Sequence, residues 1–138
     1  SCAYKIEPQA AFVIDVGFTT DLPDIPKKML GDVKLGGGPE IARTADNNEV
    51  LVNMVRKVAD ANKFIYQNTA GHRATGGTEA ASIQLSRRGV ATCLLSIPNR
   101  YMHSAVEICD LRDVESAVNI LVETIASLKG DESFIPCI

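Results

Sequence analysis

The sequence predicts an α/β fold built in layers, and two observations lead to this prediction. Short apolar runs of strand length alternate with segments whose apolar residues recur at helical spacing. The expected order is strand, irregular segment, helix, strand, helix, strand, helix. Such alternation is typical of a sheet covered by helices, whose binding sites form at the carboxyl ends of the strands. With 138 residues, the chain is long enough for one domain with a substantial core.

The first expected strand covers residues 10–14, an unbroken apolar run with Asp15 at or near its C-terminal end. Residues 17–29 contain prolines and little periodicity, which indicates a loop. The triple glycine at 36–38 ends a short alternating segment and permits close approach or unusual backbone dihedrals. It lacks the lysine and the spacing of a phosphate-binding loop, so a phosphate site is not expected there.

The clearest early helix is expected over residues 46–62. Asp46 is its expected N-cap, and Glu49, three residues later, completes a pattern like a capping box. The expected apolar face consists of Leu51, Met54, Val55 and Val58. Residues 64–66 then predict a short strand, and residues 68–77 predict a polar, glycine-rich loop that contains His72.

The second half predicts two further helices around a buried strand. Residues 78–88 predict a helix with Thr78 as its N-cap and Gly89 as its terminator. Residues 90–97 are very apolar and predict a strand that leads into a polar loop containing His103. Asp110 is the expected cap of the last helix. The expected apolar stripe of that helix consists of Val114, Ala117, Val118, Leu121, Val122 and Ile125.

Composition and charge argue against several classes of protein. The net charge is −3 and there is no basic stripe, so no nucleic-acid partner is expected. The apolar stretches are far shorter than a membrane span, and residues 1–5 lack the apolar core of a signal peptide. The four cysteines lie far apart and form no CxxC pair, which argues against a zinc knuckle. A reduced, cytoplasmic protein is therefore expected.

Two polar side chains, Asp15 and His103, follow apolar strands. A carboxylate placed after five apolar residues is costly to bury without a partner. Asp15 is therefore either a metal ligand or general base, or an aspartate that caps a helix or bonds to a loop. His103 either binds a metal or moves a proton, or it has a structural role. If both strands end at one edge of the sheet, the two side chains can reach a common site.

Other polar residues have simpler explanations. His72 lies in a loop, and Glu79 lies at a helix start where the helix dipole favours its charge. Either Glu107 or Asp110 could accept the second N–H of a metal-bound imidazole, although capping explains Asp110 equally well. No GxSxG motif is present and no cysteine lies in a nucleophile motif. The residues alone thus indicate a partial metal site and no other complete arrangement of catalytic groups.

Four segments occur in a fixed order along the chain. They are Val13-Ile14-Asp15-Val16, Lys34-Leu35-Gly36-Gly37-Gly38-Pro39-Glu40-Ile41, Gly76-Gly77-Thr78-Glu79-Ala80-Ala81 and Arg100-Tyr101-Met102-His103-Ser104. Together they closely resemble the C-terminal half of the catalytic domain of the dinuclear metallo-aminopeptidases that form tetrahedral particles. That family includes glutamyl and deblocking aminopeptidases and members labelled endoglucanase. The resemblance covers about residues 3–128.

The resemblance implies a three-layer α/β/α fold of the zinc-peptidase type. It implies that residues 1–138 form a partial domain, without its N-terminal half and without the inserted dimerisation domain. It also implies two divalent metal ions, zinc or cobalt, in the complete enzyme. Asp15 matches the terminal aspartate ligand of one ion, and His103 matches the terminal histidine ligand of the other.

The resemblance also implies residues around the metals. Arg100 and Tyr101 match the loop that supports the metal-binding histidine. The turn formed by Gly76, Gly77 and Thr78 matches a wall of the substrate cleft. Glu79 stands where the family usually has aspartate.

The family's remaining metal ligands and its glutamate general base precede the segment that matches Ser1. In the complete enzyme, two metals lower the pKa of a bridging water, and the glutamate passes its proton to the leaving amine of a short peptide. The chain alone is therefore expected to contain no catalytic residue and to be inactive. Because half a sheet exposes a strand edge, we expect homo-oligomers or association with the missing N-terminal half.

Two other functions stay open at this stage. The chain could be a degenerate, non-catalytic subunit or interaction module that kept the fold and lost the chemistry. Glycan hydrolysis, suggested by labels within the family, needs two suitably spaced carboxyl groups across a sugar cleft, and the sequence shows no clear pair.

Overall fold

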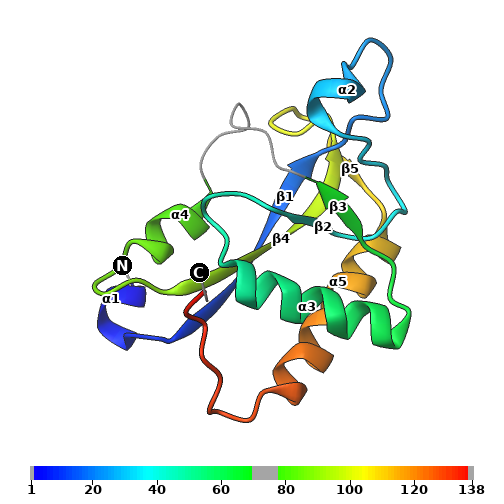
Figure 1. Ribbon diagram of the computed structural model, residues 1–138. Coiled ribbons are helices and arrows are strands. Elements are labelled where there is room, and N and C mark those ends of the chain that lie inside the picture. Colours follow the sequence, from blue (N-terminus) through cyan, green and yellow to red (C-terminus); the bar gives the residue numbers. More distant parts are fainter. Residues whose placement is uncertain (1, 70–77, 137–138) are drawn as a thin grey trace.

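A mixed sheet of five strands lies in the middle of the computed structural model, which describes residues 2–69 and 78–136 (Figure 1). The strands are β1 (Ala10–Phe18), β2 (Glu40–Ala42), β3 (Gln67–Thr69), β4 (Ala91–Arg100) and β5 (Ile108–Cys109). The helices are α1 (Cys2–Ile6), α2 (Lys27–Leu30), α3 (Glu49–Asn62), α4 (Glu79–Gln84) and α5 (Leu111–Ser127).

β4 is the central strand, and the order across the sheet is β1-β4-β2-β3. β1 runs parallel to β4 along its whole length, ending where Phe18 lies beside Asn99. β2 pairs with β4 in the antiparallel direction, with Glu40 beside Ser96, and β3 runs parallel to β2. Since β1 and β4 are parallel and in register, their carboxyl ends meet at one edge of the sheet, as the sequence predicts.

Helices cover both faces of this sheet (Figure 1). On one face, α3 and α5 pack against β2 and β4 around the fully buried side chains of Leu51, Leu95 and Ile120. On the other face, Ala80 of α4 packs against Val13 of β1 and against β4. The expected three-layer α/β/α arrangement is therefore confirmed. Within residues 2–69 and 78–136, each helix is too short or too polar to traverse a lipid bilayer.

The helix starts depend on local side-chain hydrogen bonds. Thr78 and Asp110 cap α4 and α5 as predicted, and each side chain accepts from a backbone N–H two residues later. The prediction of Asp46 as a cap is wrong. Asn48 caps α3, and its side chain accepts from the backbone N–H of Leu51 at 3.0 Å. The carbonyl of Asp46 instead accepts from the hydroxyl of Thr92, which ties this loop to β4.

Several strand and helix limits differ from the prediction. β1 extends to Phe18 and β4 to Arg100, because the two strands support each other through continuous pairing. The strand predicted at residues 64–66 is wrong: β3 begins at Gln67, which lies beside Glu40 of β2. The helix predicted over 78–88 ends earlier, at the end of α4. The short β2 was not predicted as a strand.

The buried face of α5 also differs from the predicted stripe. Ala117 is buried and Leu121 packs against the core, as expected, whereas four members of the stripe are exposed. These are Val114, Val118, Val122 and Ile125. The helix buries two polar residues instead, because both find hydrogen-bond partners. The hydroxyl of Thr124 donates to the carbonyl of Ile120, and Asp113 binds the glycine-rich turn at 36–38.

Candidate functional site

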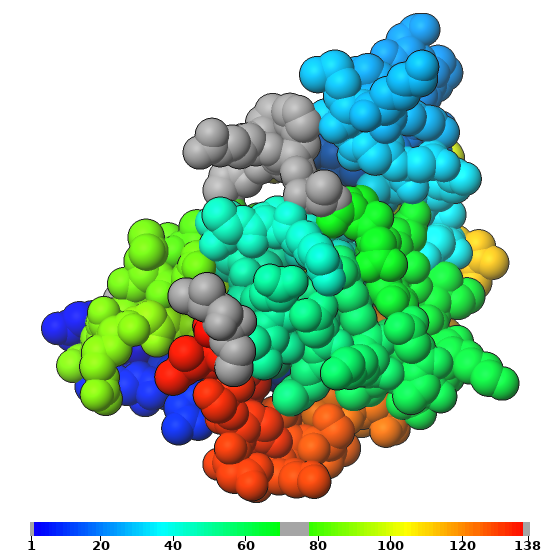
Figure 2. Space-filling model, in the orientation of Figure 1, coloured from blue at the N-terminus to red at the C-terminus, as the bar shows by residue number. Residues whose placement is uncertain are grey.

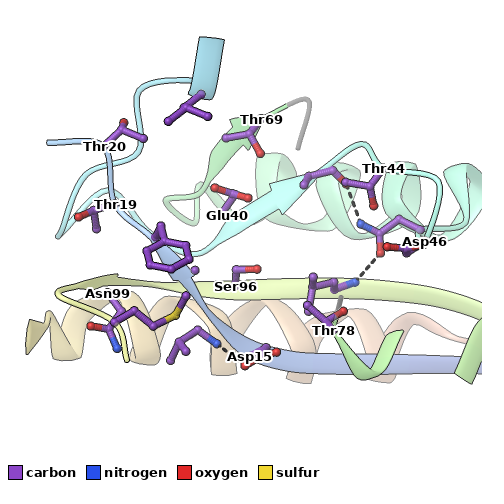
Figure 3. A pocket seen from close by; sticks show the side chains of 18 of the residues that line it. Asp15, Thr19, Thr20, Glu40, Thr44, Asp46, Thr69, Thr78, Ser96 and Asn99 are labelled. Atoms are coloured by element: carbon purple, nitrogen blue, oxygen red, sulfur yellow. Dashed lines mark hydrogen bonds between the residues drawn. The ribbon is translucent and has the colours of Figure 1, made fainter. Parts of the chain in front are cut away.

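A cavity of about 1370 Å³ lies at the carboxyl ends of β1 and β4 (Figure 3). Side chains from β1, β2, β4 and the connections that follow them line it. Four residues that the sequence and the resemblance singled out lie on its wall: Asp15, Thr78, Tyr101 and His103. The fold thus brings Asp15 and His103 to one cavity, although they are far apart in the sequence.

Asp15 lies inside β1 rather than at its end. Its partner across the sheet is Ser96, and β1 continues to Phe18. The Asp15 carboxylate accepts a hydrogen bond from the backbone N–H of Val16 at 2.8 Å. β1 is the first strand in the order of the sheet, so one side of its backbone faces no other strand of the described chain. The Asp15 carboxylate therefore satisfies one backbone N–H group of the edge strand β1 and also borders the cavity.

The loop that presents His103 is held by Glu107. Tyr101 and His103 have positive φ angles of 58° and 67°, a backbone conformation that costs free energy in residues other than glycine. Glu107 stabilises this loop by accepting from Asn99 Nδ2 at 2.8 Å and from the backbone N–H of His103 at 2.7 Å. These bonds hold the pKa of Glu107 below its usual range. Glu107 thus contacts the backbone of His103, where the sequence suggested a bond to its ring. The Phe18 ring lies edge-on to the His103 ring, with 6.0 Å between centroids.

Arg100 binds an aspartate at the base of a neighbouring segment. The segment that carries α2 projects from the body of the molecule (Figure 1, Figure 2). Arg100, the last residue of β4, binds Asp21 at the base of this segment with two hydrogen bonds of 3.0 and 2.6 Å. The Asp21 carboxylate also accepts from the backbone N–H of Leu35 at 3.3 Å. This contact joins both ends of the projecting segment to the end of β4.

We expect the substitution Asp21→Asn to make stability less sensitive to acid. The Arg100 guanidinium holds the pKa of the Asp21 carboxyl well below its usual range, at about 2. A carboxyl whose pKa is depressed by folding stabilises the protein above its unfolded pKa, about 4, and this contribution disappears as the pH falls toward the folded value. Between about pH 4 and pH 2, the free energy of unfolding should therefore fall more steeply in the wild type than in the variant. Urea denaturation at several pH values measures the free energy of unfolding of the wild type and of the variant. An equally steep fall in the two proteins would contradict the prediction.

The structure describes only some residues of the predicted wall of the substrate cleft. Thr78 lines the cavity and caps α4. Glu79, the first residue of α4, is exposed and does not line the cavity. Gly76, Gly77 and the loop histidine His72 lie outside the described residues.

The structure adds a cavity residue that the sequence did not single out as functional. Glu40 at the start of β2 points into the cavity near Ser96 and Thr69 (Figure 3). Burial raises the pKa of its carboxyl group. Because β2 is short and starts directly after Pro39, its residues show no strand periodicity. In the sequence, these residues were distinguished only because Glu40 and Ile41 belong to one of the four segments that resemble the family.

The donor types at the cavity suit a zinc-like ion, but their number is too small. An aspartate oxygen and a histidine nitrogen are common zinc ligands, and a catalytic zinc ion takes three protein ligands. No group of three or more His, Cys, Asp or Glu side chains that could hold a metal occurs within residues 2–69 and 78–136. Asp15 and His103 therefore form part of a metal centre at most.

Comparison with known proteins decides the family. Residues 1–120 match the family model described as M42 glutamyl aminopeptidase. This chain belongs to that family. A curated relative, lysyl aminopeptidase of Pyrococcus furiosus, is 35% identical over 127 residues, which are 92% of this chain and 36% of the relative.

Solved structures agree with this assignment. An aminopeptidase from the archaeon Desulfurococcus kamchatkensis superposes with a TM-score of 0.78 at 32% identity, over 91% of this chain and 36% of that one. The TET1 peptidase of Pyrococcus horikoshii, which can assemble into a tetrahedron or a large octahedral shell, gives a TM-score of 0.62 at 28% identity, over 91% of this chain and 37% of that one. This M42 chain thus spans a little more than a third of the length of these proteins.

Proposed function

We propose that this chain is the C-terminal part of the catalytic domain of a metal-dependent aminopeptidase, which removes N-terminal residues from short peptides. The observation that carries the proposal is the approach of Asp15 on β1 and His103 after β4 to one cavity. Membership of the M42 glutamyl aminopeptidase family supports the same reaction.

In this proposal, Asp15 and His103 supply one ligand each to two divalent ions, zinc or cobalt. The remaining ligands and the general base come from the rest of a longer catalytic domain, so the chain alone is inactive. Tyr101 and Thr78, which line the cavity, contact the peptide. Arg100 acts indirectly, by holding the end of β4 through Asp21.

We expect His103→Ala to weaken zinc binding by the chain at least about tenfold, since one of few ligands is lost. Calorimetric titration with zinc measures the affinity. The control is His72→Ala, which removes the only other histidine of the chain. Equal zinc affinity in wild type and His103→Ala would remove His103 from the proposed site. That outcome would favour the alternative of a non-catalytic subunit or interaction module.

We also propose that the chain associates, either as a homo-oligomer or with the N-terminal half of the domain. The exposed side chains of Ile14, Val16 and Phe18 on the edge strand β1 support this proposal. Sedimentation velocity tests it, and a single monomeric species at micromolar concentration would contradict it. We also propose a cytoplasmic location. Among the described residues, Cys2, Cys93 and Cys109 are free thiols, as expected in a reducing compartment.

A further inference from the structure

The cavity contains a carboxylate that the proposed metal site does not use. Glu40 lies on β2, across from Asp15 in the sheet, because β4 separates β1 from β2. Its Cα pairs with Ser96, whose hydroxyl borders the same cavity. Figure 3 shows the Glu40 side chain between the side chains of Thr69 and Ser96. Glu40 is half-buried. A carboxylate that is partly removed from water is stabilised when another group replaces the lost hydration.

The cations near Glu40 bind other groups. Arg43 also lines the cavity, but its guanidinium lies 3.9 Å from the Glu49 carboxylate and donates to Asn53 at 3.2 Å. Arg56 donates to a backbone carbonyl of β2. Among the described residues, no lysine or arginine forms an ion pair with Glu40. The negative charge therefore faces the cavity without a cation from this part of the chain.

The same cavity contains buried polar atoms that lack hydrogen-bond partners among the described residues. They are the hydroxyls of Thr19 and Thr69 and the side-chain oxygen of Asn99. Thr19 and Asn99 are only 5% and 4% exposed. More than nine in ten buried polar groups in native proteins are hydrogen-bonded, so these atoms point to a ligand that supplies partners. An amide oxygen only accepts, and a carboxylate only accepts. The Glu40 carboxylate and the Asn99 oxygen therefore need hydrogen-bond donors, and the negative charge of Glu40 favours a donor that is a cation.

We propose that Glu40 makes the cavity select peptides whose N-terminal residue carries a cationic side chain. Its carboxylate accepts hydrogen bonds from the ammonium group of lysine or the guanidinium group of arginine. Ser96, which is paired with Glu40, and the polar residues Asn99 and Thr19 line the same cavity. This specificity rests on the proposed aminopeptidase function.

Two amides that differ only in the side-chain terminus test the proposal. Lysinamide has a terminal ammonium group, and norleucinamide has the same carbon chain without it. Ligand-observed NMR titration of the full chain gives both affinities. We expect wild type to prefer lysinamide by about tenfold, the factor that one charge-assisted hydrogen bond supplies.

The substitution Glu40→Gln should remove most of this preference and leave the affinity for norleucinamide unchanged. The matched control is Glu49→Gln, which removes another carboxylate of the cavity wall that already has Arg43 as its partner. This control should keep the preference. Glu40→Asp retains the charge and should keep part of the preference, so it separates loss of charge from damage to the fold. Circular dichroism verifies that each variant is folded.

Equal affinities of the wild type for both amides would overturn the role of Glu40 and leave the aminopeptidase proposal intact. A preference that persists in Glu40→Gln would also overturn it, and would indicate that another group of this chain provides the preference. n-Butylammonium, which lacks the peptide end, is the second probe. If it binds in a Glu40-dependent manner while neither amide binds, the cation site stands and the peptide contacts proposed for Tyr101 and Thr78 fail.

Discussion

Alanine at position 38 is expected to lower the free energy of unfolding by about 3–5 kcal/mol. A Cβ atom on Gly38 would lie 2.1 Å from the carbonyl oxygen of Ile65 and 2.8 Å from the Cα of Tyr66. Both are backbone atoms, which cannot move aside as a flexible side chain can. The φ angle of Gly38 is also +83°, a conformation that alanine adopts only with strain. Urea denaturation followed by circular dichroism measures the loss.

Gly130→Ala is the matched control for this prediction. Gly130 has a similar φ of +89°, but a Cβ atom there would meet nothing within 4 Å. The control should therefore report only the cost of the left-handed backbone, about 1 kcal/mol. If Gly38→Ala costs no more than Gly130→Ala, then the close contact with residues 65 and 66 does not stabilise the fold.

The substitution Asp113→Ala is expected to cost about 2–4 kcal/mol. Asp113 is fully buried in α5, and its carboxylate accepts from the backbone N–H of Gly36 at 2.9 Å and from that of Gly38 at 2.7 Å. Alanine removes both acceptors and leaves the buried N–H of Gly38 without a partner, which costs more than the loss of an exposed hydrogen bond. The same denaturation measurement checks this value.

Glu115→Ala provides the control on the same helix, because Glu115 is exposed and makes no side-chain hydrogen bond among the described residues. Its effect should stay within about 0.5 kcal/mol. Asp113→Asn should give an intermediate loss, since an amide keeps one oxygen acceptor and loses the charge. Equal stability of Asp113→Ala and Glu115→Ala would show that the glycine turn does not depend on α5.

Both substitutions bear on the site as well as on stability. The turn at 36–38 leads through Pro39 directly into β2, whose first residue is Glu40. A loosened turn would change the position of the Glu40 carboxylate relative to Ser96. Folded variants at Gly38 or Asp113 should therefore also lose part of the preference for lysinamide that we attribute to Glu40.

Local signals in the sequence predicted the parts of the fold that depend on neighbouring residues. Thr78 and Asp110 were recognisable as caps because a cap needs only its own side chain and the next turn of helix. The cap of α3 was misplaced by two residues, since Asp46 and Asn48 are both good caps. The hydrogen bond between Thr92 on β4 and the Asp46 carbonyl favours Asn48 as the cap. The local sequence does not reveal this bond, because the two residues are far apart in the chain.

The candidate site was partly predictable for a similar reason. Asp15 and His103 stood out because each is a polar residue after an apolar strand, and the parallel pairing of β1 and β4 then brings them to one cavity. Glu40 did not stand out, because its strand has three residues and too little periodicity to be recognised. Its burial comes from β3 and β4, which flank β2 on either side.

The sequence by itself determined the layered α/β class, the apolar strands and the starts of two helices, because these follow from hydrophobic periodicity and short-range hydrogen bonds. It also carried the family segments that relate the chain to aminopeptidases. Only the tertiary structure decided which face of α5 is buried, that Asp113 binds a turn 77 residues earlier, and that Glu40 faces the cavity. Those outcomes depend on partners distant in the chain, whose positions are set by packing of the whole sheet and its helices.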